Sequence, residues 1–266
     1  MIRLGIFDSG IGGLTVFREV REAVPGAEIL YFGDTARVPY GTKSAETVTR
    51  YSLQIAWYLV GRNMDAVVVA CNTASAYAID TLREAVTVPV FGVVDPGARA
   101  AVKATKNGVI GVIGTRGTIS SGAYRKAISD LDEGIKTVAT SCPLFVPLVE
   151  EGWLFDPITQ QVAMKYLEPH LKAGVDTLVL GCTHYPLLKD IISMVMGGEV
   201  TLIDSAQETA RDVGAYLKEA GMVDEFQRGR EQFEVTDSIE RFSEVGRIFL
   251  NHELENIRQV TIVEDE

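Results

Sequence analysis

The sequence has few cysteines, few prolines and no long apolar run. Its 266 residues include three cysteines and nine prolines. An odd number of cysteines does not suit a disulfide framework and indicates reduced thiols in a reducing compartment. No apolar run approaches the roughly 18 residues of a membrane span, and no signal-peptide pattern precedes the first strand-like segment. We therefore expect a soluble, cytoplasmic protein.

An excess of basic residues is also missing. The 25 Lys and Arg residues against 36 Asp and Glu residues give a formal net charge of −11. This charge argues against nucleic acid as a substrate and against an anionic membrane surface as a partner. It does not exclude a small anionic ligand, because backbone N–H groups bind such a ligand at contact distance whatever the global charge.

The apolar residues that are present alternate between strand and helix patterns. Short Val- and Ile-rich runs at residues 2–7, 29–32 and 66–69 are separated by helical patterns at residues 14–20 and 44–60. Buried strands that alternate with amphipathic helices are typical of a parallel sheet in an α/β fold. We predict that fold class.

The chain also repeats itself weakly. Residues 65–71 read DAVVVAC and residues 176–182 read DTLVLGC, while residues 4–8 have a counterpart in residues 110–114. A repeat of this length predicts a duplicated domain. We expect two similar flavodoxin-like lobes related by a pseudo-twofold axis, with the active site in the cleft between them. The first lobe is predicted to comprise residues 1–95 and 205–266, and the second residues 96–204. The helix that follows Asp204, through about Lys218, is expected to pack on the first lobe.

The repeat gives two of the cysteines equivalent positions. Cys71 and Cys182 each end a strand and are each followed by a threonine within two residues. Ligands bind at the carboxyl ends of strands in open parallel sheets, and free N–H groups at a helix start bind anions and lower a thiol pKa. Either cysteine alone could be a buried structural residue. Their matched positions favour a function and predict two thiols on opposite sides of one cleft.

Three other features leave alternatives open. His184 lies in a polar strand-end motif and could protonate a reacting group or adjust Cys182, whereas His170 and His252 lie in charged helical surroundings typical of the surface. Asp8 either caps a helix or orients substrate or thiol. The glycines that follow it, Gly10, Gly12 and Gly13, do not match a dinucleotide fingerprint, because Thr15 stands where the third glycine is needed. They do not match a Walker loop either, because no Gly-Lys-Ser/Thr follows. A metal site is disfavoured by the lack of a C-x-x-C pair.

Paired thiols suit the inversion of an amino-acid carbon. One base removes the Cα proton and an acid on the opposite face returns one, so two similar groups from two lobes solve the geometry and allow both directions. Backbone N–H groups and hydroxyls would then stabilise negative charge on the α-carboxylate. No lysine motif indicates a pyridoxal Schiff base, so we expect no cofactor.

Five segments together resemble the glutamate racemases of the aspartate/glutamate racemase superfamily. They are residues 8–14 (DSGIGGL), 38–41 (VPYG), 70–75 (ACNTAS), 146–152 (VPLVEEG) and 181–186 (GCTHYP). The resemblance implies interconversion of L- and D-glutamate, with D-glutamate destined for peptidoglycan, in an enzyme that is often a homodimer. Some relatives carry an N-terminal extension tied to activation by a cell-wall precursor; this sequence begins directly at its first expected strand, so that regulation is not expected.

The resemblance also implies roles for particular residues. The thiol that matches Cys71 takes the proton from the D-isomer, and the one that matches Cys182 takes it from the L-isomer. Asp8, Glu150 and His184 match assisting residues. The positions that match substrate contacts are Asp8, Ser9, Tyr40, Gly41, Asn72, Thr73, Thr183 and His184.

Two other functions remain possible on the sequence alone. Aspartate racemases share the duplicated fold and paired cysteines, although the sequence His184-Tyr185-Pro186 favours the glutamate enzymes. A two-lobed amino-acid-binding protein without catalysis would not need matched thiols. Turnover of both amino acids, and exchange of the Cα hydrogen with solvent, would separate these alternatives.

Overall fold

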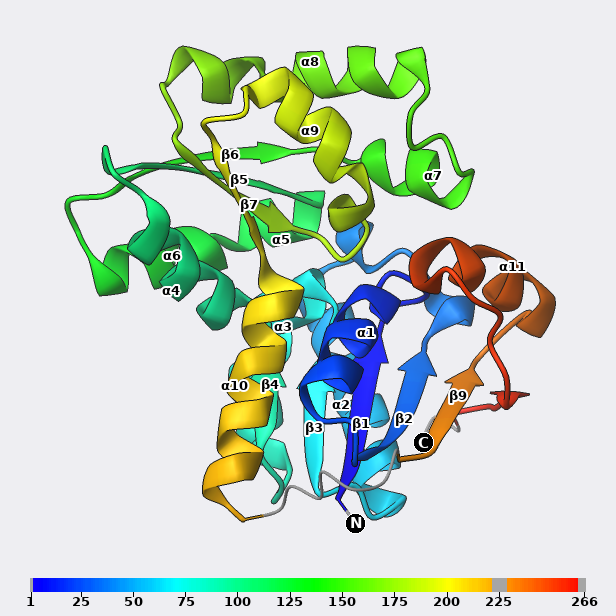
Figure 1. The fold of residues 1–266 in the computed structure, drawn as a ribbon. Coiled ribbons are helices and arrows are strands. Elements are labelled where there is room, and N and C mark those ends of the chain that lie inside the picture. Colours follow the sequence, from blue (N-terminus) through cyan, green and yellow to red (C-terminus); the bar gives the residue numbers. More distant parts are fainter. Residues whose placement is uncertain (1, 222–228, 263–266) are drawn as a thin grey trace.

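The computed structural model describes residues 2–221 and 229–262, which form two parallel β-sheets flanked by helices (Figure 1). The strands of the first sheet are β1 (Arg3–Asp8), β2 (Glu28–Gly33), β3 (Ala66–Val69), β4 (Val90–Gly92), β9 (Glu231–Val235) and β10 (Ile257–Gln259). Those of the second sheet are β5 (Val109–Gly114), β6 (Lys136–Ser141), β7 (Thr177–Gly181) and β8 (Thr201–Asp204).

The two sheets share one strand order. The first runs β10-β9-β2-β1-β3-β4 and the second β6-β5-β7-β8, so the central order β2-β1-β3-β4 recurs in the second sheet. All neighbouring strands are parallel. The predicted α/β class is therefore confirmed. β3 and β7, which precede the two matched cysteines, occupy the same place in their sheets.

Continuous apolar sequence explains why these strands lie at the centre of the sheets. Every residue of β3 and of β7 is buried, as expected for strands with helices on both faces. One cluster of buried apolar side chains runs from β1 and β2 to β7 and the helices around it. The two sheets thus share part of one core.

The helices that flank the first sheet come from both ends of the chain. They are α1 (Leu14–Ala23), α2 (Ala45–Gly61), α3 (Asn72–Ala85), α10 (Ser205–Glu219) and α11 (Ile239–Leu250), with the short turns η1 (Thr35–Arg37) and η2 (Tyr40–Thr42). The helix that follows β4, α4 (Val94–Ala104), packs on the second sheet. The predicted helix after Asp204 is α10, and it packs against α1 as expected, with further contacts to α4 (Figure 1).

The second sheet has its own set of helices. They are α5 (Arg116–Ser121), α6 (Ala123–Leu131), α7 (Phe145–Glu150), α8 (Pro157–Lys172) and α9 (Lys189–Met196), with the turn η3 (Tyr185–Leu188). α4 contacts α6, β7 and β8, so it belongs to the packing of this sheet as well as to that of α10. The predicted boundary at residues 95–96 lies inside α4, and the division into lobes stays a prediction.

The structure tests the predicted surface positions of two histidines. His170 lies on α8 and is fully buried, so its predicted surface position is wrong, whereas His252 is exposed as expected. The helical run around His170 is charged, but this residue falls on the face of α8 that covers the second sheet, where Gly111 approaches its ring.

Over residues 2–221 and 229–262, no helix is long and apolar enough to cross a membrane.

Candidate active site

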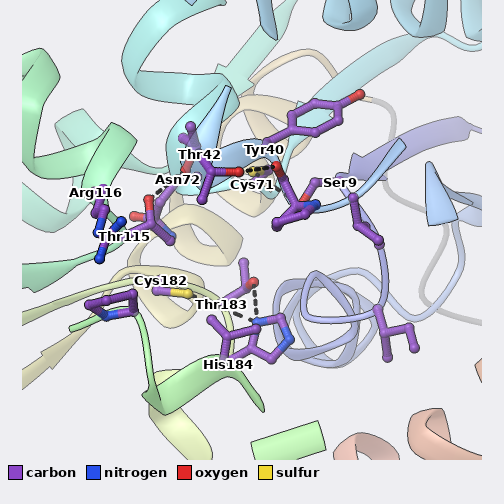
Figure 2. A pocket seen from close by; sticks show the side chains of 18 of the residues that line it. Ser9, Tyr40, Thr42, Cys71, Asn72, Thr115, Arg116, Cys182, Thr183 and His184 are labelled. Carbon is purple, nitrogen blue, oxygen red and sulfur yellow. Dashed lines mark hydrogen bonds between the residues drawn. The ribbon is translucent and has the colours of Figure 1, made fainter. Parts of the chain in front are cut away.

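A cavity of about 190 Å³ lies where the carboxyl ends of strands from both sheets meet. Register explains the meeting: Phe7 is paired with Val69 in the first sheet and Gly114 with Gly181 in the second. The residues that follow these strands therefore emerge at one edge of each sheet, as in other parallel α/β folds. Figure 2 shows the two thiols on different sides of the cavity, Cys71 near Ser9 and Cys182 near His184.

Cys71 stands at the start of α3 and is 6% exposed. Its Sγ lies 3.6 Å from Ser9 Oγ. Burial, followed by the negative charge of Asp8, raises the pKa of the Cys71 thiol to about 12, although a hydrogen bond from the Ala74 N–H acts in the opposite direction. The expectation that the helix start lowers this pKa is therefore wrong. Removal from water and a nearby carboxylate outweigh the N–H groups.

Cys182 follows β7 and belongs to a chain of polar contacts. Its Sγ lies 3.9 Å from His184 Nδ1, and His184 Nε2 lies 2.9 Å from Glu150 Oε1. Burial disfavours the imidazolium, but hydrogen bonds with Cys182 and Glu150 outweigh it and raise the pKa of His184 to about 10. Burial alone would raise the pKa of Glu150, yet the hydrogen bond and the charge of His184 hold that pKa below its usual value. At neutral pH an imidazolium therefore stands beside Cys182.

Asp8 lies beneath the cavity and does not line it. It is 1% exposed, its Oδ2 accepts a hydrogen bond of 2.9 Å from the Gly10 N–H, and burial raises the pKa of its carboxyl group. The first residue before α1 is Gly13, and no side chain caps that helix. Asp8 therefore supports the loop rather than capping the helix, and its charge reaches Cys71.

The glycine-rich loop brings the two sheets together. A Cβ atom at Gly12 would stand 2.2 Å from Thr183 Oγ1 and 2.4 Å from His184 Nδ1. The Thr15 hydroxyl, at the start of α1, donates a hydrogen bond of 3.1 Å to the Thr183 carbonyl. The absence of a side chain at Gly12 thus lets the loop after β1 lie directly against the loop after β7.

The sequence-predicted substrate contacts gather in the same place. All of them except Asp8 line the cavity: Ser9, Tyr40, Gly41, Asn72, Thr73, Thr183 and His184. Glu150, Cys71 and Cys182 line it too. Among the residues that the structure describes, Asn72 Nδ2 is buried without a hydrogen-bond partner. A buried donor in this state is suited to an anionic ligand.

Contacts across the cavity fix several of these side chains. The Thr73 hydroxyl lies 2.8 Å from Thr115 Oγ1 and 3.2 Å from Thr118 Oγ1, which joins the starts of α3 and α5. The Tyr40 hydroxyl donates to Asp34, which also accepts from Arg37 Nε at 2.7 Å. The Tyr40 hydroxyl is therefore held by the buried carboxylate of an ion pair whose arginine is half-buried.

Some cavity residues were not predicted as site residues, although several of them lie within the five segments that carry the family resemblance. They are Gly10, Ile11, Val38, Pro39, Thr42, Thr115, Arg116, Pro143, Val146 and Pro147. A signal for Thr115 and Arg116 was present, because they follow residues 110–114, the counterpart of the strand that ends at Asp8. Cys142 is buried, and its Sγ lies 3.6 Å from the Thr140 carbonyl oxygen. In the described part of the chain, no three His, Cys, Asp or Glu side chains form a group that could hold a metal ion.

Comparisons with known proteins agree on one family. A family model described as Asp/Glu/Hydantoin racemase matches residues 12–213. The glutamate racemase of Geobacter metallireducens is 52% identical over 260 residues, which cover 97% of this chain and 96% of that protein.

Solved structures give the same result. Glutamate racemase isoform RacE1 from Bacillus anthracis superposes with a TM-score of 0.94 at 39% identity, covering 98% of each chain. Glutamate racemase from Francisella tularensis, solved in complex with D-glutamate, superposes with a TM-score of 0.92 at 35% identity, again covering 98% of each chain.

Proposed function

Because the chain belongs to the Asp/Glu/Hydantoin racemase family and is an amino-acid racemase, an isomerase, we propose that it interconverts L- and D-glutamate by a cofactor-independent reaction with two cysteine bases. The observation that carries the proposal is the pair of buried thiols, Cys71 and Cys182, which line one cavity from equivalent strand ends. The relatives at high identity and full coverage support glutamate as the substrate.

The proposed reaction moves one proton at each face of Cα. The thiolate of Cys182 takes the Cα proton of L-glutamate, and its electron pair stays on the substrate as a carbanion. The Cys71 thiol then donates its proton to the opposite face, which gives D-glutamate and a Cys71 thiolate. D-glutamate reacts in the reverse order. Because burial and Asp8 oppose a Cys71 thiolate, the ammonium group of the substrate supplies the positive charge that favours it.

Neighbouring side chains assist each thiol differently. The His184 imidazolium, held by Glu150, lies against Cys182 and stabilises its thiolate. Asp8 supports the loop that carries Ser9 and Gly10, next to Cys71. The two directions of the reaction therefore depend on different assisting residues.

Polar groups of the cavity hold the substrate. We assign the unpartnered Asn72 Nδ2 and the hydroxyls of Ser9, Thr73 and Thr183 to the carboxylates and the ammonium group. Donors held in place by the fold stabilise the charge that develops on the α-carboxylate as Cα loses its proton. Tyr40 and Gly41 line the same cavity.

Single-cysteine variants test the two-base scheme. Cys71→Ala and Cys182→Ala should each lower racemisation in both directions by a factor on the order of 10³ or more, since each removes one proton-transfer group. Cys142→Ala is the matched control, because that buried thiol does not line the cavity, and it should keep its turnover. Circular dichroism with L- and D-glutamate measures the rates, and near-normal turnover in either of the first two variants would refute the scheme.

The substrate and the reaction class have their own tests. Wild-type enzyme should exchange the Cα hydrogen of glutamate for solvent deuterium during inversion and should leave aspartate nearly untouched. Activity on aspartate alone would transfer the assignment to an aspartate racemase. Binding of glutamate without exchange would instead indicate a binding protein.

The biological setting follows from the same assignment. We propose a cytoplasmic homodimer that supplies D-glutamate for peptidoglycan, since the three cysteines are free thiols and suit a reducing compartment. Depletion of the protein in its host should stop wall synthesis, and added D-glutamate should restore it. Sedimentation of the purified protein measures the oligomeric state, and a monomer at all concentrations would contradict the dimer.

A further inference from the structure

Tyr124 on α6 is buried, 2% exposed, and reaches from the second sheet to the start of α3. Its hydroxyl lies 2.7 Å from Asn72 Oδ1 and 3.5 Å from the Val93 carbonyl oxygen. Burial raises the pKa of Tyr124 well above its usual value, so the hydroxyl keeps its proton and acts as a donor to Asn72. Asn72 immediately follows Cys71 in the chain.

The ring of the same tyrosine packs against the strand that leads to the other thiol. A Cβ atom at Gly181 would lie 3.2 Å from Tyr124 Cε2, and one at Gly97 would lie 3.3 Å from Tyr124 Cε1. Gly181 immediately precedes Cys182. Tyr124 therefore contacts a direct chain neighbour of each cysteine, although it does not line the cavity itself.

The hydrogen bond decides how the Asn72 amide is presented. An amide group has one accepting oxygen and one donating nitrogen, and the Tyr124 hydroxyl occupies the oxygen. The nitrogen is left without a partner among the described residues, in a side chain that lines the cavity and is 3% exposed. Rotation of the amide by half a turn would turn the oxygen toward the place where an anionic substrate must bind. The Tyr124 hydroxyl would then accept from the amide nitrogen, and its own proton would have to exchange the hydrogen bond of 2.7 Å to Asn72 for the longer one of 3.5 Å to the Val93 carbonyl.

We infer that Tyr124 is a positioning residue of the racemase site, which holds the Asn72 amide so that its N–H group faces the substrate carboxylate. This inference rests on the proposed function, because it assigns Asn72 to glutamate. It predicts that Tyr124 acts on substrate binding through Asn72 and on neither thiol directly.

The test is a double-mutant cycle of Tyr124→Phe and Asn72→Ala. Tyr124→Phe keeps the ring that packs on Gly97 and Gly181 and removes only the hydroxyl. It should raise the KM for both glutamate isomers roughly three- to tenfold, with a smaller change in kcat, as expected for the loss of one hydrogen bond. In the Asn72→Ala background the same change should have no further effect on kcat/KM, because the amide it orients is gone.

Tyr58→Phe provides the matched control. This substitution also removes a hydroxyl that hydrogen-bonds a partner, Glu234 at 2.8 Å, but Glu234, unlike Asn72, does not line the cavity. Its KM should equal that of wild type, and thermal unfolding of all variants separates misfolding from loss of positioning. An unchanged KM in Tyr124→Phe, or an equal effect with and without Asn72, overturns the inference. Failure of the wild-type enzyme to racemise glutamate would refute the proposed function instead.

Discussion

The two cysteines hold equivalent positions in the fold but face opposite charges. Cys71 lies near the carboxylate of Asp8, whereas Cys182 lies against the imidazolium of His184. A neighbouring anion disfavours a thiolate and a neighbouring cation favours it. At the scale of the residue, the duplicated backbone therefore places the two thiols in electrostatically different surroundings.

Removal of the carboxylate beside His184 should shift the pH profile. The pKa of His184 is raised to about 10 by its hydrogen bonds to Cys182 and Glu150 against the cost of burial, so the imidazolium persists at neutral pH and is lost as pH rises through that value. In Glu150→Gln the charged partner is gone, and the alkaline limb of kcat/KM for L-glutamate should move down by one pH unit or more, about tenfold at a fixed alkaline pH. Rates measured between pH 6 and 10.5 give the limb.

Glu151→Gln is the control for this change. Glu151 is the adjacent residue, is exposed, and pairs with Arg241 at 3.2 Å, so its substitution changes the net charge equally without touching His184. Its pH profile should match that of wild type. Superimposable profiles for the two variants would show that Glu150 does not set the charge of His184.

His170 should make the protein sensitive to acid. Neither ring nitrogen has a hydrogen-bond partner among the described residues, and burial lowers the pKa of His170 to about 4. The folded state thus resists a proton that the unfolded chain binds below pH 6.5, so stability falls as pH decreases from there toward 4. His170→Met should unfold at higher urea concentration than wild type at pH 5, by a free energy on the order of 2 kcal/mol. The difference should be much smaller at pH 7.5, and an equal difference at both values would exclude titration of this ring.

At the scale of the element, the sequence predicted the positions of the strands and helices better than it predicted which side chains are buried or lie near charges. Apolar runs that end in Asp8 and in the two cysteines indicated the ends of the central strands, because strands covered by helices on both faces are mostly apolar. The burial of His170 and the high pKa of Cys71 depend on residues far away in the chain. The repeat points to Thr115, but its contact with Thr73 depends on the packing of α5 against α3.

Close approach of two loops makes Gly12 a critical position. Thr183 Oγ1 and His184 Nδ1 occupy the space that a Cβ atom at residue 12 would need. Gly12→Ala must therefore displace the loop after β7, which carries Cys182, and a displacement of about 1 Å costs roughly 10² in rate. We expect kcat to fall by about that factor while the protein remains folded.

Gly61→Ala, at a position with free space, is the control for Gly12→Ala. Gly61 ends α2, and no atom lies within 4 Å of a Cβ built there. Gly61→Ala should therefore keep full activity and gain a little thermal stability from its higher helix propensity. If Gly12→Ala were as active as Gly61→Ala, the loops would be free to separate without harm, and contact between the two halves would not set the position of the thiol.

At the scale of the whole molecule, the net charge of −11 opposes the approach of an anionic substrate. The cavity mouth compensates locally. Arg116 is the only Lys or Arg among the described residues that line the cavity, its side chain is exposed, and Figure 2 places it beside Thr115, away from His184. We expect this exposed cation to attract the anionic substrate at a distance and to leave the chemical step unchanged.

Arg116→Gln should accordingly lower kcat/KM several-fold at low salt and leave kcat nearly unchanged. The deficit should shrink as ionic strength rises, because the Debye length falls from about 30 Å at 0.01 M to about 10 Å at 0.1 M. Arg125→Gln, an exposed arginine on α6 outside the cavity lining, makes the same change in net charge. If Arg125→Gln lost as much activity as Arg116→Gln, the total charge of the molecule and not the cation at the entrance would govern substrate capture.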